Sequence, residues 1–82
     1  MITIYTKDYC PYCTQAKTLL KSLNQEYTEV DVTNDQAKLM EISQKSGLQT
    51  VPQIFVGEKC IGGFSDIDAL NNEGKLLDQL KG

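Results

Sequence analysis

Two cysteines in Cys10-Pro11-Tyr12-Cys13 are the residues of this 82-residue chain whose type and spacing best suit chemistry. Side chains three positions apart at the start of a helix lie on one face, and two thiols placed in this way are close enough to form a disulfide. A bond between them can open and close again. The spacing therefore predicts a reversible dithiol.

The two thiols should have different roles. If a helix begins at Cys10, its first N–H groups have no helical partner and favour an anion such as a thiolate. Pro11 suits the first helical position because it has no N–H, and Lys7 adds a positive charge nearby. Cys13 lies one turn further in, where desolvation disfavours its charged form. We expect Cys10 to attack a disulfide and Cys13 to resolve the resulting mixed disulfide.

Half a zinc site is the main alternative for a C-x-x-C motif. A structural zinc site takes four cysteine or histidine ligands, whereas this chain has three cysteines and no histidine. Zinc would need a carboxylate or a second subunit, so we predict no metal. A purely structural disulfide is also disfavoured, since it would close a very small loop. The third thiol, Cys60, is interpreted as packing in a short strand rather than as a regulatory cysteine.

Length and composition favour a single domain spanning residues 1–82. With 40% hydrophobic and 23% charged residues the chain should be globular, and its net charge of −3 argues against a broad nucleic-acid or membrane role. The first residues do not have the pattern of a signal peptide, and no apolar run has the length of a membrane span. An odd number of cysteines suits a reducing compartment, so we expect a cytoplasmic location.

Hydrophobic periodicity predicts a strand, a helix and a second strand in the first part of the chain. Residues 2–6 and 27–32 alternate apolar and polar side chains, as strands do. Between them an apolar stripe at helical spacing is formed by Ala16, Leu19, Leu20 and Leu23. Because a helix connects the two strands, they should be parallel neighbours.

A second helix and a hairpin are predicted next. Thr33 or Asn34 can cap the helix, which should end at Gly47. The apolar runs 53–56 and 59–61 flank a tight turn and should form an antiparallel hairpin.

The end of the chain is predicted to be helical. Ser65 and Asp68 have the spacing of a capping box, and after a break at residues 72–74 the helical pattern continues over residues 76–80. The predicted fold is therefore α/β, with the order β-α-β-α-β-β-α and a four-stranded mixed sheet flanked by helices.

Three motifs occur in order along the chain, namely Cys10-Pro11-Tyr12-Cys13, Thr50-Val51-Pro52 and Gly62-Gly63-Phe64-Ser65-Asp66. With these motifs the chain resembles the dithiol glutaredoxins of the thioredoxin fold over essentially its whole length. The resemblance implies a glutathione-dependent oxidoreductase that reduces protein disulfides and protein–glutathione mixed disulfides. It implies a monomer that binds no cofactor and uses glutathione as its reducing co-substrate, with ribonucleotide reductase among the candidate partners.

The resemblance also implies a glutathione site. In that family the bond before the proline matching Pro52 is cis, and the backbone of Val51 would pair with glutathione as with an added strand. The N–H groups of Phe64 and Ser65 would bind the γ-glutamyl carboxylate, and Asp66 the α-amine. The implied glutathione-binding residues are Lys7, Tyr12, Thr50, Val51, Pro52, Gly63, Phe64, Ser65 and Asp66.

Simpler readings of three of these residues remain open. In these interpretations Ser65 and Asp66 cap a helix and bind no glutathione, and Lys7 is a solvated surface charge. Lys7 is otherwise implied to meet the glycine carboxylate of glutathione, while Tyr12 borders the same groove. Many relatives have Gln or Arg in the second helix at the position of Leu39; here the neighbouring Lys38 is the available substitute.

Two other functions fit the same fold. A redoxin specific for ribonucleotide reductase would take electrons from thioredoxin reductase; such relatives usually carry Trp-Ser-Gly-Phe-Arg-Pro where this chain has residues 61–66, and Asp66 favours glutathione instead. A [2Fe–2S] carrier would hold the cluster between Cys10 thiolates of two subunits and two glutathiones. Cluster-binding relatives mostly have Gly or Ser after the first cysteine, whereas Pro11 stiffens this loop.

Overall fold

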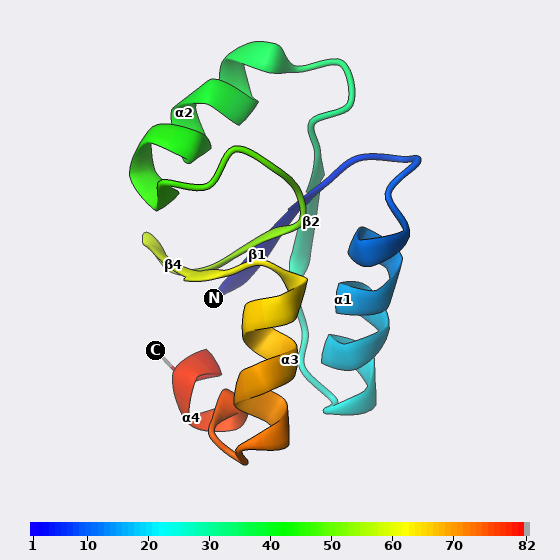
Figure 1. The fold of residues 1–82 in the computed structure, drawn as a ribbon, viewed down its shortest axis with the longest axis vertical. Helices are drawn as coiled ribbons and strands as arrows, with labels where there is room; N and C mark the ends of the chain where they lie inside the picture. The colour runs from blue at the N-terminus through cyan, green and yellow to red at the C-terminus, as the bar shows by residue number, and fades with distance from the viewer. Residues whose placement is uncertain (82) are drawn as a thin grey trace.

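A four-stranded sheet lies between helix α2 on one face and helices α1 and α3 on the other (Figure 1). The computed structural model describes residues 1–81; Gly82, the last residue of the predicted domain, lies outside them. The strands are β1 (Ile2–Thr6), β2 (Thr28–Asp31), β3 (Gln53–Val56) and β4 (Lys59–Gly62). The helices are α1 (Pro11–Ser22), α2 (Gln36–Ser46), α3 (Phe64–Asn72) and α4 (Leu76–Leu80).

The strand order is β2-β1-β3-β4. Strand β1 runs parallel to β2 and antiparallel to β3, and β3 pairs with β4 in an antiparallel hairpin. The predicted mixed sheet, including its parallel pair and its hairpin, is therefore confirmed. Strand β2 is shorter than the predicted 27–32, and β4 continues one residue beyond the predicted 59–61.

The core lies between the sheet and helices α1 and α3. Ile4 of β1 is paired with Ile54 of β3, and both are fully buried against Leu20 of α1 and Ile67 of α3. Burying a side chain of this size contributes about 1.5–3 kcal/mol. This core fixes the N-terminal ends of α1 and α3 relative to the strands.

Helix α2 begins later than predicted. Its N-cap is Asp35, whose carboxylate accepts a hydrogen bond from the Lys38 N–H at 3.0 Å. The predicted caps, Thr33 and Asn34, were wrong, because the Thr33 hydroxyl instead accepts a hydrogen bond from the Asp8 N–H at 2.9 Å. The predicted end at Gly47 is confirmed, and this residue has the left-handed conformation with φ of 78°.

Helix α3 begins earlier than predicted. Its N-cap is Gly63, and Asp66 Oδ2 accepts a hydrogen bond from the Gly63 N–H at 3.0 Å. The capping box predicted for Ser65 and Asp68 was therefore wrong by two residues. The break predicted at residues 72–74 is confirmed for residues 73 and 74, whereas Asn72 still belongs to α3; the break separates α3 from α4.

Candidate active site

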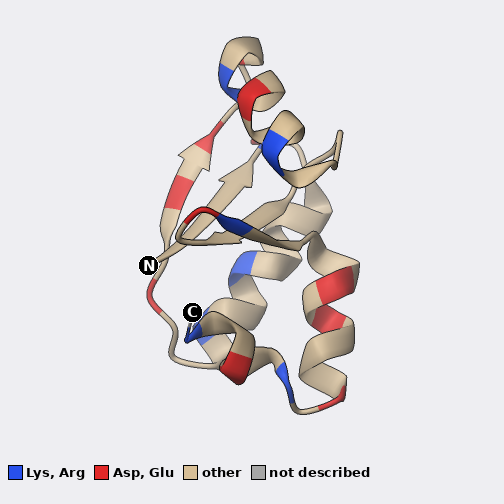
Figure 2. Cartoon of the chain, turned by 90° about the vertical axis from the view of Figure 1, so that its left-hand side faces the viewer, with Lys and Arg blue, Asp and Glu red and all other residues tan. Residues whose placement is uncertain are grey.

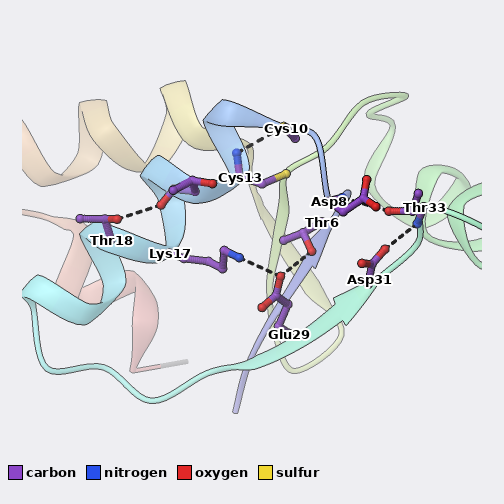
Figure 3. Close-up of polar contacts among 10 residues, drawn as sticks. Thr6, Asp8, Cys10, Cys13, Lys17, Thr18, Glu29, Asp31 and Thr33 are labelled. Atoms are coloured by element: carbon purple, nitrogen blue, oxygen red, sulfur yellow. Dashed lines mark hydrogen bonds and ion pairs between the residues drawn. The ribbon is translucent and has the colours of Figure 1, made fainter.

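The Cys10 thiol caps the N-terminus of α1. Its Sγ accepts a hydrogen bond from the Cys13 N–H at 3.3 Å (Figure 3). Pro11 occupies the first turn of the helix. The Cys10 thiol also donates to the carbonyl oxygen of Val51 at 3.7 Å, which places the sulfur beside the loop before β3. Cys10 is half-buried, so an incoming disulfide can reach it. The predicted nucleophile thus lies at a helix N-terminus, where its sulfur accepts a hydrogen bond from a backbone N–H.

The Cys13 thiol is buried, with 1% of its surface exposed. Burial raises the pKa of the Cys13 thiol to about 12, and its hydrogen bond with Cys10 acts in the same direction. At neutral pH this thiol keeps its proton. A buried, protonated thiol agrees with a resolving role for Cys13, which must lose its proton only after a mixed disulfide has formed on Cys10.

An ion pair lies close to Cys13 and was not predicted from the sequence. Lys17, one helical turn after Cys13, places its Nζ 3.0 Å from Glu29 Oε2 on β2 (Figure 3). The Thr6 hydroxyl donates to the same carboxylate oxygen at 2.7 Å. The positive charge of Lys17 lowers the pKa of Cys13, although burial outweighs it.

A groove of about 390 Å³ lies beside the dithiol, between the loop before β3 and the start of α3. We call it the dithiol groove. It is lined by Tyr12, Leu48, Thr50, Val51, Pro52, Gly63, Phe64, Ser65 and Asp66. All of the predicted glutathione-binding residues except Lys7 line it. Leu48 was missed, because a lone leucine in a loop gives no signal in the sequence.

The two lysines considered for the glycine carboxylate of glutathione, Lys7 and Lys38, do not line the dithiol groove. Lys7 holds its Nζ over the Tyr9 ring, 5.9 Å from the ring centroid. Lys38 forms an ion pair with Glu41 at 2.9 Å, and Leu39 lines a different hollow beside α2.

The loop on one side of the groove is held by a buried glutamine. The Val51–Pro52 peptide bond is cis, as predicted. Gln53 is fully buried, and its Nε2 donates to the carbonyl oxygens of Leu48 at 3.2 Å and Thr50 at 3.1 Å. Its Oε1 accepts a hydrogen bond from the Ser46 hydroxyl at 2.8 Å. Gln53 was assigned only to an apolar strand from the sequence, yet it positions the loop that faces Cys10.

Two glycines allow the other side of the groove to come close. Gly62 has a φ of 120°, and a Cβ there would lie 2.5 Å from Asp66 Cβ. A Cβ on Gly63 would lie 3.1 Å from the Pro52 carbonyl oxygen. The first hydrogen bond of α3 runs from the Ile67 N–H to Gly63 at 3.1 Å, so the preceding N–H groups have no helical acceptor. The start of α3 is therefore suited to bind an anion.

The third cysteine, Cys60, lies outside the dithiol groove. Cys60 is half-buried in β4, and burial raises the pKa of its thiol. Over residues 1–81, no group of three or more His, Cys, Asp or Glu side chains is arranged to hold a metal ion. Within the same part of the chain, no helix has the length and apolar character needed to cross a membrane.

The glutaredoxin family model matches residues 2–61. The chain belongs to the glutaredoxin family. Glutaredoxin 3 of Escherichia coli K12 is 44% identical to this glutaredoxin over 80 residues, which cover 98% of this chain and 96% of the relative. Human glutaredoxin-1 is 35% identical over 86 residues, which cover 98% of this chain and 81% of the relative.

Solved structures agree with this assignment. A crystal structure of a buckwheat glutaredoxin–glutathione complex superposes with a TM-score of 0.90 at 30% identity, over 98% of this chain and 76% of the other. The solution structure of a Brucella melitensis glutaredoxin gives 0.86 at 42% identity, over 98% and 87% of the two chains. The thioredoxin fold is thus established for this glutaredoxin, and its family indicates a thiol–disulfide oxidoreductase.

Proposed function

We propose that this glutaredoxin uses glutathione to reduce protein disulfides and protein–glutathione mixed disulfides. The observation that carries the proposal is the position of the Cys10 thiol, 3.7 Å from the Val51 carbonyl oxygen at the edge of the dithiol groove. A glutathionyl group in this groove would bring its sulfur to the nucleophile. The buckwheat glutaredoxin, which has the same fold, has been crystallised with glutathione.

The groove offers complementary groups for glutathione. The backbone of Val51 would pair with the tripeptide as a neighbouring strand does, beside Thr50 and Pro52. The free N–H groups at the start of α3, on Phe64 and Ser65, would bind the γ-glutamyl carboxylate.

Charged groups would complete the site. Asp66 would pair with the α-amine through the oxygen that does not accept from Gly63. Lys7 would leave the Tyr9 ring to meet the glycine carboxylate, since an exposed cation–π contact contributes only about 0.5–1 kcal/mol. Tyr12 would border the bound tripeptide.

Reduction of a glutathionylated protein needs only Cys10. The Cys10 thiolate attacks the glutathione sulfur, which breaks the protein–glutathione disulfide, releases the protein thiolate and forms a disulfide between Cys10 and glutathione. A second glutathione thiolate attacks the glutathione sulfur of that disulfide. Oxidised glutathione leaves, and the Cys10 thiolate is restored.

Reduction of a protein disulfide needs both cysteines. The Cys10 thiolate attacks one protein sulfur, so the other leaves as a thiolate and a mixed disulfide forms. Cys13 loses its proton and attacks the Cys10 sulfur, which releases the second protein thiolate and forms the Cys10–Cys13 disulfide. Two glutathiones reduce this disulfide and leave as oxidised glutathione. The function needs a compartment that keeps glutathione reduced, which agrees with the expected cytoplasmic location.

Serine variants of the three cysteines test the proposed roles. Cys13→Ser should keep the reduction of glutathionylated peptides and lose the reduction of protein disulfides. Cys10→Ser should lose both activities. Cys60→Ser is the matched control, because it removes a thiol outside the dithiol groove, and it should keep both. Turnover by Cys10→Ser would contradict the assignment of the nucleophile.

A further inference from the structure

A second groove, of about 360 Å³, runs between α1 and α3. We call it the α1–α3 groove. Its walls include Leu19 and Phe64, with Thr14, Thr18 and Ser22 along α1 and Asp68 on α3. Phe64 lines this groove and the dithiol groove alike. Phe64 is therefore a wall common to the two neighbouring grooves.

The end of the α1–α3 groove nearest the dithiol is marked by an aromatic pair. The rings of Tyr12 and Phe64 lie with their centroids 6.1 Å apart, at an interplanar angle of 31°. Thr14 is one helical turn beyond Cys10, so the α1–α3 groove begins close to the nucleophile. A glutathionyl group would fill the dithiol groove during the reaction. The protein part of the same mixed disulfide must then contact neighbouring surface, and the α1–α3 groove adjoins the occupied one at Phe64.

Three polar groups of the α1–α3 groove, on Thr18, Ser22 and Asp68, favour a hydrogen-bond donor or a cation. The Thr18 hydroxyl donates to the Thr14 carbonyl at 2.9 Å, and the Ser22 hydroxyl donates to the Leu19 carbonyl at 2.7 Å. Because both hydroxyl protons are donated within α1, the two hydroxyl oxygens can only accept hydrogen bonds from a ligand. Asp68 is half-buried and is the one carboxylate of the groove.

Asp68 also lacks a cation of its own. The ion pairs within residues 1–81 are Lys17–Glu29 and Lys38–Glu41, and neither includes Asp68. Helix α3 carries acidic but no basic residues (Figure 2). A positively charged side chain lying over Leu19 could pack its apolar stem in the groove and place its charged end at Asp68.

We infer that the α1–α3 groove binds the protein part of a glutathionylated substrate and selects lysine or arginine residues near the modified cysteine through Asp68. This inference rests on the proposed function, of which it names the substrate class. It assigns substrate selection to a surface that shares only Phe64 with the proposed glutathione site.

Three glutathionylated peptides test the inference. They are identical except that the residues flanking the cysteine are lysine, glutamine or glutamate. The wild-type protein should have the highest kcat/KM with the lysine peptide. Asp68→Asn should lower the preference for lysine over glutamine by about 5-fold, the value of one modest ion pair, and leave turnover of a small glutathione mixed disulfide unchanged. Asp78→Asn, which removes the same charge from α4 outside both grooves, is the control and should keep the wild-type preference.

An equal preference in Asp68→Asn and Asp78→Asn would overturn the inference while leaving the proposed function intact. Failure of the wild-type protein to turn over even the small mixed disulfide would contradict the proposed function itself. In that case the binding of a peptide to the α1–α3 groove, followed by NMR, still tests the inference. The lysine peptide with serine in place of cysteine should shift the NMR amide signals of Thr18, Leu19 and Asp68, and unchanged signals would overturn the inference. Shifts that depend on protein concentration alone would assign the groove to a second copy of the chain and also overturn it.

Discussion

Replacing Gln53 by leucine removes the side chain that fixes the loop before Pro52. The glutamine side chain is fully buried; it donates two hydrogen bonds to carbonyl oxygens of the loop and accepts one from Ser46. Leucine fills a similar volume and can make none of these bonds. The substitution therefore tests whether the polar contacts, rather than the bulk of the side chain, hold the loop.

The magnitude follows from these three hydrogen bonds. Each contributes roughly 0.5–1.5 kcal/mol net, which gives about 1.5–4.5 kcal/mol for the set. The added apolar contacts of leucine offset part of this loss. We expect Gln53→Leu to lower the free energy of unfolding by about 2–3 kcal/mol. A loosened Val51 should also lower kcat/KM for a glutathionylated peptide by on the order of 10-fold, because the groove no longer orients the disulfide.

Urea unfolding and steady-state kinetics measure the two effects. Gln44→Leu is the matched control, since Gln44 is exposed on α2 and takes no part in these hydrogen bonds; it should stay within about 0.5 kcal/mol of the wild type. If Gln53→Leu unfolds like the wild type, the hydrogen-bond argument is wrong. If it is destabilised but keeps the wild-type kcat/KM, the loop does not position the substrate.

Three further predictions concern the groove and the resolving step. Gly62→Ala should raise the KM for glutathione by roughly 10- to 100-fold, because the added Cβ would displace Asp66. Gly57→Ala is the control: Gly57 also has a positive φ, but no atom beyond those of its chain neighbours lies within 4 Å of its added Cβ, so the KM should stay unchanged. Burial, the first cause of the raised Cys13 pKa, remains when Cys10 is held in a mixed disulfide, although the contribution of the Cys10 thiol is then lost. In stopped-flow experiments the resolution of a mixed disulfide should therefore speed up about tenfold per pH unit between about pH 6 and 9, and a plateau below pH 8 would oppose this. A hydrogen bond from the buried Thr6 hydroxyl lowers the pKa of Glu29, so the carboxylate's contribution to stability is complete above the ordinary glutamate pKa and is lost as the pH falls through the lowered pKa. Glu29→Gln should flatten the acid decline of the unfolding free energy, and superimposable curves would refute this.

Local rules explain why the dithiol could be predicted from the sequence. A cysteine before proline at the start of an apolar stripe determines its own cap geometry, and the Cys13–Cys10 contact spans only three residues. The cap of α3 shows the limit of such rules. Both Gly63-Asp66 and Ser65-Asp68 have the three-residue spacing of a capping box. The helix begins at the earlier pair, where Gly63 comes close to the Pro52 carbonyl oxygen, and residue spacing gives no information about that contact.

Contacts between distant segments could not be predicted in this way. The Lys17–Glu29 pair depends on where α1 crosses the parallel β1–β2 pair, and the three hydrogen bonds of Gln53 depend on how a loop folds back over β3. The orientation of Lys7 depends on its competing contact with Tyr9. Sequence spacing identified the two cysteines to which we assign the reaction, whereas the side chains around them, such as Lys17 and Gln53, became evident only from the tertiary structure.

The central claim is that glutathione is the electron donor. The most direct measurement is the consumption of NADPH during reduction of a glutathione mixed disulfide, with the protein, glutathione and glutathione reductase, beside the same assay with thioredoxin reductase in place of the glutathione system. The proposed function predicts rapid consumption with the glutathione system alone. Turnover with thioredoxin reductase alone would contradict it and would withdraw the roles given to Lys7, Val51 and Asp66.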